Sequence, residues 1–193
     1  MKNYSLAAIL ALALFSQAAA AAAQGTDWRT ALNFGVLSEK KQDGVTTKPG
    51  MPAGFEAARA LGDRLELGLA YTYAEVNYET ALGDTSFFNH FIQVFAAYKL
   101  DSLVKGLYAG PQIGFVSRSW DKSGENLGFD CLSAGARAGY DRFFTERLSL
   151  GVQVQFVYAG GEEKTIKNNN SSVTYSVNDT HYTLGLLTLG YRF

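Results

Sequence analysis

The stretch LSLGVQVQFVY (148–158) alternates between apolar and small or polar residues with a period of two. Its apolar face carries Leu148, Leu150, Val152, Val154, Phe156 and Tyr158. This alternation predicts a β-strand with one face in an apolar environment. The strand is longer than the roughly five or six residues usual in globular sheets, and it matches a tilted strand that crosses a membrane.

The same alternation recurs along the chain and predicts eight strands, at 27–38, 53–62, 64–78, 87–100, 107–118, 128–142, 148–159 and 181–193. Short connections at 62–64, 101–106 and 143–147 alternate with longer polar ones at 39–52, 79–86, 119–127 and 160–180. Aromatic residues gather near the strand ends, as in the girdles of membrane barrels. Because only a closed sheet satisfies its backbone hydrogen bonds in lipid, we expect an all-β fold, an eight-stranded antiparallel up-and-down transmembrane β-barrel.

If the apolar face meets lipid, the other face fills the barrel. The polar residues that we expect in this lumen are Arg29, Glu66, Gln93, Gln112, Arg137, Gln153 and Gln155. An eight-stranded barrel has an interior just wide enough for side chains, so we expect a packed network with a charge pair between Glu66 and Arg137. The alternative is a narrow pore for small solutes lined by the same residues, which the inward Phe91 and Phe95 disfavour.

The strand at 53–62 is the least regular of the eight. Glu56 and Arg59 are three residues apart, so one of them faces the apolar side unless a bulge intervenes. The sequence alone leaves the phase of this strand open.

Residues 1–23 have the pattern of a secretory signal peptide. Lys2 precedes the apolar run 6–15, and small residues follow up to Ala23. We therefore expect residues 1–23 to be removed on export and 24–193 to form the barrel domain. The apolar run is shorter than the roughly 20 residues of a membrane-spanning helix.

The composition excludes several classes of function. With 17 basic and 18 acidic residues the net charge is −1, which gives no electrostatic footprint for nucleic acid. A single cysteine, Cys131, excludes an intramolecular disulfide and a cysteine-based zinc site, and we expect it to pack inside the barrel.

The histidines, His90 and His181, lie far apart, so we expect no metal site, no cofactor and no enzymatic activity. A lipid hydrolase, which needs a histidine beside a serine, is the third functional alternative.

The longest predicted connection, 160–180, is the candidate for recognition. Its stretch VTYSV (173–177) alternates as though a hairpin continued above the membrane, where an exposed edge can pair with a partner strand. The candidate contact residues are Glu162, Lys164, Lys167 and Tyr175.

Three segments resemble the small outer-membrane β-barrels of Gram-negative bacteria, of the OmpA, OmpX and opacity-protein types. They are GLYAGPQIGF (106–115), GARAGYDRFFTERLSLG (135–151) and LGYRF (189–193). The last resembles the family's assembly signal, with Leu189, Tyr191 and Phe193 as its residues, which implies recognition by the outer-membrane assembly machinery. A weak repeat also relates DRLELGL (63–69) to ERLSLGV (146–152) at an offset of 83.

These observations predict a monomeric outer-membrane protein surrounded by membrane lipids and lipopolysaccharide. Its expected role is envelope structure, surface interaction with a host or envelope partner through external loops, or both.

Overall fold

The computed structural model describes residues 27–40, 46–80, 83–122, 125–168 and 171–193. Its strands are β1 (Trp28–Glu39), β2 (Thr46–Lys48), β3 (Ala53–Leu61), β4 (Leu65–Thr80), β5 (Gly83–Lys99), β6 (Leu107–Lys122), β7 (Glu125–Phe143), β8 (Leu148–Ala159), β9 (Glu162–Asn168), β10 (Ser171–Val177) and β11 (Thr180–Arg192). The predicted signal segment lies outside the described residues. Within them, no helix is long and apolar enough to cross a membrane.

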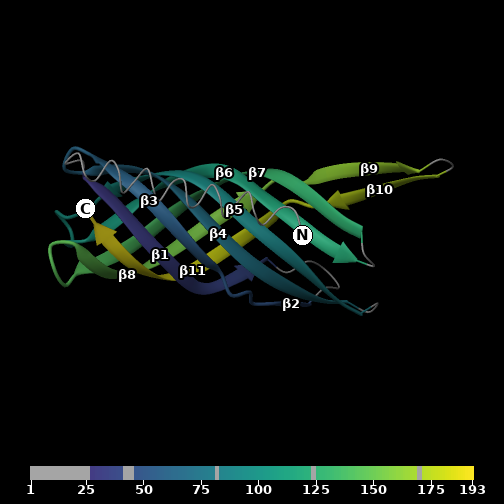
Figure 1. Ribbon diagram of the computed structural model, residues 1–193, viewed down its shortest axis with the longest axis horizontal. Helices are drawn as coiled ribbons and strands as arrows, with labels where there is room; N and C mark the ends of the chain where they lie inside the picture. The colour runs from purple at the N-terminus through teal and green to yellow at the C-terminus, as the bar shows by residue number, and fades with distance from the viewer. Residues whose placement is uncertain (1–26, 41–45, 81–82, 123–124, 169–170) are drawn as a thin grey trace.

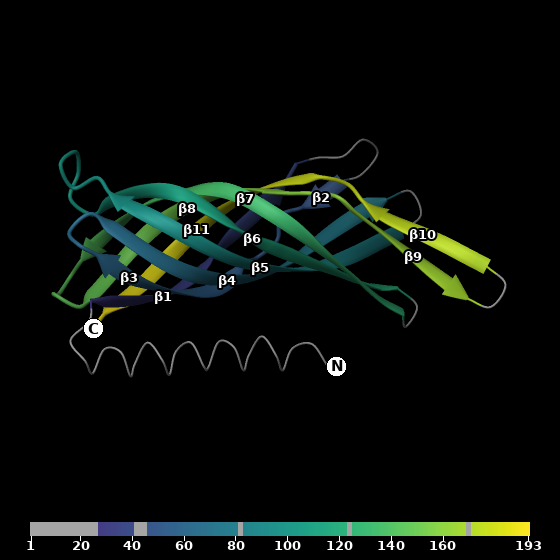
Figure 2. The ribbon, with the colours of Figure 1, turned by 90° about the horizontal axis from the view of Figure 1, so that it is seen from above.

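Eight antiparallel strands close into a barrel in the order β1, β3, β4, β5, β6, β7, β8 and β11 (Figures 1 and 2). Closure comes from the pairing of β11 with β1, in which Leu189 lies opposite Leu32. The predicted eight-stranded barrel is therefore confirmed. β2 is a short segment that pairs with the far end of β4.

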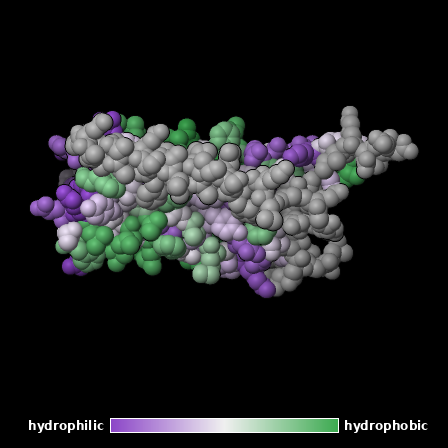
Figure 3. All heavy atoms as spheres, in the orientation of Figure 1, coloured by the Kyte–Doolittle hydropathy of each residue, from purple (hydrophilic) through white to green (hydrophobic). Residues whose placement is uncertain are grey.

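The strand phase also agrees with the prediction. Along β8 the side chains alternate strictly between exposed and buried, with Val152 and Val154 outside and Gln153 and Gln155 inside. Figure 3 shows the resulting apolar band along the flank of the barrel, with hydrophilic residues at either end. Because the short turns and the end of the chain lie at one end, that end faces the periplasm and the other faces the outside.

Two of the predicted loops are wrong. The ladder continues to Thr80 opposite Gly83 and to Lys122 opposite Glu125, so the expected polar loops at 79–86 and 119–127 are mostly strand. In the sequence of both strand ends polar residues no longer alternate with apolar ones, because a strand that extends beyond the lipid needs no apolar face. The alternation that identifies a membrane strand is therefore lost there.

The structure shows which residues of β3 face the lumen, and the strand contains no bulge. Its register with β4 is unbroken from Ala53 to Leu61, and Glu56 is buried while Arg59 is exposed on the outer face. Arg59 sits near the periplasmic end of β3, where its long side chain can reach the membrane surface.

Candidate functional site

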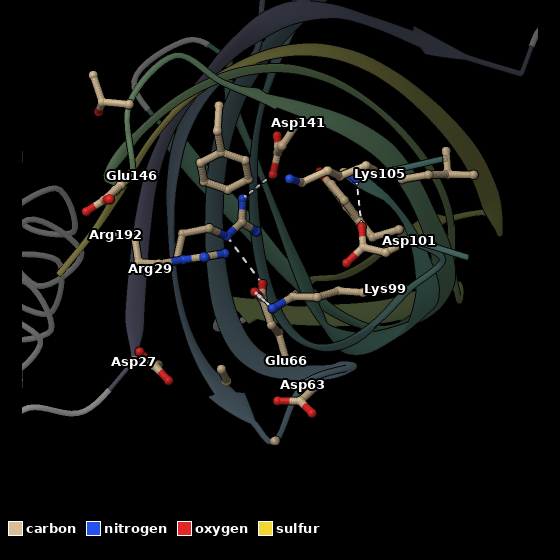
Figure 4. A pocket seen from close by; sticks show the side chains of 17 residues that line it. Asp27, Arg29, Asp63, Glu66, Lys99, Asp101, Lys105, Asp141, Glu146 and Arg192 are labelled. Atoms are coloured by element: carbon tan, nitrogen blue, oxygen red, sulfur yellow. Dashed lines mark hydrogen bonds and ion pairs between the residues drawn. The ribbon is translucent and has the colours of Figure 1, made fainter. Parts of the chain in front are cut away.

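The lumen opens at the periplasmic end into a vestibule of about 550 Å³ (Figure 4). Its deeper part is lined by the buried side chains of Arg29, Glu66 and Asp141. Charged residues from the turns and from the end of β11 form its rim, among them the exposed Asp63, Asp101, Lys105 and Glu146 and the half-buried Arg192. The charge is therefore buried and paired at the base of the vestibule and hydrated at its mouth.

Three cations and three carboxylates form a continuous network at the base of the vestibule. Arg29 contacts Glu56 at 2.8 Å, Asp141 at 2.9 Å and Glu66 at 3.3 Å. Lys99 contacts Glu66 at 3.0 Å, and Arg137 contacts Glu56 at 2.9 Å. Buried charges are tolerated when each has opposite charges and hydrogen bonds around it, which this arrangement provides.

The predicted pair between Glu66 and Arg137 is wrong. Glu66 pairs with Arg29 and Lys99 near the periplasmic end, whereas Arg137 lies deeper and pairs with Glu56. The sequence prediction missed Glu56 because the phase of β3 was open, and Glu56 is the carboxylate that joins the two arginines. Asp141, the third carboxylate of the network, was not singled out from the sequence.

Amide side chains continue the network from Arg137 across the barrel. Arg137 Nε donates to Gln112 at 2.9 Å, and Gln112 donates to Gln155 at 3.3 Å. Gln155 then donates to Gln153, and Gln153 donates to the Tyr108 hydroxyl at 2.9 Å. On another strand Gln93 donates to Ser133 Oγ at 2.7 Å. All seven residues predicted to line the lumen are therefore buried inside the barrel.

The middle of the lumen is filled. The Arg137 guanidinium lies 3.7 Å from the centre of the Phe95 ring, close enough for a cation–π interaction. Phe95 in turn occupies the space over Gly68, where a Cβ would overlap the ring. Both Phe95 and Arg137 are almost completely buried, so these side chains close the barrel at this level.

The outer half of the lumen is mainly apolar. A buried cluster there is formed by Leu37, Ala74, Val76, Phe91, Val116, Phe129, Cys131, Val157, Ala159, Tyr182, Leu184 and Leu186. Arg118 crosses it, donating to the Tyr182 hydroxyl at 2.7 Å and to the Asn178 carbonyl at 3.1 Å. Tyr78 donates to Glu39 at the outer end of β1. The sequence did not single out this apolar cluster. Its inward residues alternate with apolar outward residues, so polarity does not distinguish the two faces of these strands.

β9 and β10 form a two-stranded sheet that projects past the outer end of the barrel (Figure 1). The hairpin expected from 173–177 is therefore confirmed, and it extends over most of the predicted loop. Thr165 lies opposite Thr174, and their hydroxyls are 3.0 Å apart.

The base of this hairpin is fixed to the barrel by three of the predicted contact residues. Glu162 accepts a hydrogen bond from the Asp130 backbone N–H at 2.6 Å, and Lys164 donates to the Gly128 carbonyl at 3.0 Å. Tyr175, with Val177, packs against the apolar cluster of the outer lumen. Lys167 belongs to β9, but its side chain lies outside the described part of the structure. The exposed surface of the hairpin lies further out, at Val173, Thr165 and Thr174.

The histidines have aromatic surroundings. His90 Nδ1 is 2.8 Å from the Tyr71 hydroxyl, and its ring packs against Tyr73. His181 packs against Tyr158. These are positions of the outer aromatic girdle, where a polar tip meets an apolar body. Among the described residues, no group of three or more His, Cys, Asp and Glu side chains is placed to hold a metal ion.

The last strand lies at the seam of the barrel. The backbone N–H of Phe193 donates to the Trp28 carbonyl at 2.9 Å, and the rings of Tyr191 and Phe193 pack edge to face. Leu189, Tyr191 and Phe193 all lie exposed on the outer face. This geometry leaves their side chains accessible at the strand that closes the sheet.

A family model for the outer membrane protein beta-barrel domain matches residues 7–193. The chain belongs to this family. It is an outer-membrane protein of the Gram-negative type, in agreement with its closed barrel and apolar outer band. Comparison with curated proteins gives no significant sequence match.

Solved structures share the fold at low sequence identity. Neisserial surface protein A aligns with a TM-score of 0.62 and 17% identity, over 88% of this chain and 97% of that one. Outer membrane protein W of E. coli aligns with a TM-score of 0.56 and 13% identity, over 87% and 98% of the two chains. Ail, the attachment invasion locus protein of Yersinia pestis, aligns with a TM-score of 0.51 and 11% identity, over 87% and 97%.

Proposed function

We propose that this protein is a non-enzymatic surface protein of the outer membrane that binds other molecules through the outer part of the β9–β10 hairpin. The observation that carries the proposal is the anchored base of this hairpin. Glu162, Lys164 and Tyr175 hold it against the barrel. A hairpin held in this way presents its outer part with little loss of conformational entropy on binding.

The outer part of the hairpin offers two means of binding. Val173 is 47% exposed, on the same face as Tyr175 but beyond the rim of the barrel. In the described part of the chain, β9 and β10 pair as strands only with each other, so their outer edges are available for an added strand. Ail, which has a similar fold, was crystallised in complex with the heparin analogue sucrose octasulfate.

The filled lumen supports a surface role over the narrow pore. Phe95 and Arg137 close the barrel at mid-height, and the apolar cluster that includes Phe91 and Tyr182 closes its outer half. Residues that could select a solute are paired with one another rather than exposed along a channel.

The test uses bacteria that display the protein and a layer of cultured epithelial cells as the binding surface. Residues 160–179 are replaced by Asn-Gly, which can join the last register pair, Ala159 and Thr180, through a tight turn. A second variant, Val173→Asp, replaces only the exposed apolar side chain on the outer part of the hairpin. Adhesion should be lost in the first variant and reduced in the second, while both barrels keep the heat-dependent gel mobility of folded protein.

The matched control is Glu163→Gln, which changes the charge of the hairpin on the face opposite Val173. It should adhere like the unaltered protein. Equal adhesion by all four strains, or none by the unaltered strain, would refute the proposal for this surface.

A further inference from the structure

Two hairpins on opposite sides of the barrel carry the same arrangement of arginines. β3 and β4 form one hairpin and β7 and β8 form the other, separated by two strands in each direction around the barrel. Arg59 and Arg64 in the first correspond to Arg142 and Arg147 in the second, at the offset of 83 seen in the sequence repeat. All four side chains are exposed.

The register of the arginines is the same in both hairpins. Arg59 lies opposite Leu67, and Arg142 lies opposite Leu150, so both point outward, toward the membrane. The leucines belong to the apolar outer band. Each pair thus places a guanidinium at the periplasmic border of the lipid-facing surface.

The second arginine of each hairpin is held by a tyrosine on the next strand. Arg64 Nη1 donates to the Tyr98 hydroxyl at 3.3 Å, and Arg147 Nη1 donates to the Tyr191 hydroxyl at 3.4 Å. In both cases the tyrosine lies opposite the residue that follows the arginine, Leu65 or Leu148. These tyrosines face outward, so the turn arginines are directed to the membrane side.

The acidic residues of the two turns are directed elsewhere. Asp63 and Glu146 each precede the turn arginine, and both line the vestibule. Each turn therefore places its carboxylate at the mouth of the lumen and its guanidinium on the outer surface. This separation leaves a local positive charge where lipid headgroups meet the barrel.

We infer that each hairpin binds the phosphate of an anionic phospholipid of the periplasmic leaflet, one at Arg59, Arg64 and Tyr98 and one at Arg142, Arg147 and Tyr191. Arginine presents several N–H donors in a fork that matches phosphate oxygens. A tyrosine hydroxyl at the interface can add a further donor while its ring stays in the apolar layer. The acyl chains would lie along the leucines of the outer band.

The test is native mass spectrometry of the protein purified from outer membranes, titrated with phosphatidylglycerol. The unaltered barrel should retain two lipids, and the variants Arg59→Gln/Arg64→Gln and Arg142→Gln/Arg147→Gln should each retain one. At the altered site, affinity should fall about 25-fold, because each basic residue near a membrane surface contributes roughly fivefold. Lysine in place of the same arginines should give intermediate affinity.

The charge-matched control is Lys40→Gln/Lys48→Gln, which removes two exposed cations from the extracellular side. It should keep both lipids, and zwitterionic phosphatidylcholine should show no comparable retention. Unchanged binding in the fourfold arginine variant with folded gel mobility would overturn the inference, as would an equal loss in the lysine control. Displacement of the lipid by an equal concentration of inorganic phosphate would also overturn it, because the site would then bind free phosphate.

Discussion

Arg137 Nη1 donates to Glu56 Oε2 at 2.9 Å, joining strands β7 and β3 across the lumen from positions 81 residues apart. Glu56 Oε1 simultaneously accepts from Arg29 on β1. One carboxylate thus connects three strands that are distant in sequence. A small number of buried charged groups therefore connects strands on different sides of the barrel interior.

Replacing Glu56 should destabilise the barrel more than any other single lumen change. Glu56→Ala leaves Arg29 and Arg137 buried with one carboxylate fewer, and loss of one partner of a buried pair costs about 3–5 kcal/mol. Urea unfolding in detergent micelles measures the change. The exposed Glu163→Gln should leave the free energy of unfolding within about 0.5 kcal/mol of the unaltered value. Equal stability of Glu56→Ala and the unaltered protein would show that the network contributes little.

The packed lumen predicts an electrically silent barrel. In planar bilayers the unaltered protein and Glu66→Gln should show no discrete current steps, because Phe95 and Arg137 fill the middle of the lumen. Because the apolar cluster closes the outer half as well, a water-filled path needs its large side chains removed too, so steps are expected in Phe91→Ala/Phe95→Ala/Arg137→Ala/Tyr182→Ala. Steps from the unaltered protein that shift in Arg137→Ala would instead establish the narrow pore.

The sequence predicted the barrel because lipid imposes one rule on every membrane strand, an apolar outer face that alternates with the lumen. Val152 and Gln153 follow that rule, and it assigned every singled-out lumen residue to the correct side. The alternation does not tell at which height along the barrel axis a lumen residue lies. Because strands tilt and are staggered against one another, residues of different strands cannot be matched in height from the sequence alone. The partner of Arg137 was therefore mistaken, although its location inside was not.

The exposed contact residues of the extracellular hairpin could not be predicted from the sequence for a different reason. In water both faces of a strand can be polar, so periodicity no longer separates a contact surface from an anchor. Tyr175 looked available for recognition but packs on the barrel, whereas Val173, two residues away, is exposed. The choice between them depends on the height of the rim, which is a tertiary property.

The terminal aromatic residue should matter more for assembly in cells than for stability. Phe193→Ser removes an exposed ring at the closing strand, so the refolded barrel should unfold within about 0.5 kcal/mol of the unaltered protein. If LGYRF (189–193) is read by the assembly machinery, less protein should reach the outer membrane, as measured by cell fractionation. Phe144→Ser, in an exposed periplasmic turn, is the matched control. Equal outer-membrane levels of both variants would count against an assembly role for Phe193.

The hairpin should protect Cys131 from reagents outside the cell. Cys131 is 3% exposed within the outer apolar cluster, against which Tyr175 and Val177 of the hairpin pack. A membrane-impermeant maleimide should therefore leave the folded protein unlabelled on intact cells and label it after denaturation. Replacing 160–179 by Asn-Gly removes Tyr175 and Val177, and labelling of the folded variant should become measurable. Val173→Asp keeps both packing residues and should remain unlabelled. Rapid labelling of the unaltered barrel would show that the outer lumen is open to solvent, and the hairpin would then have no covering role.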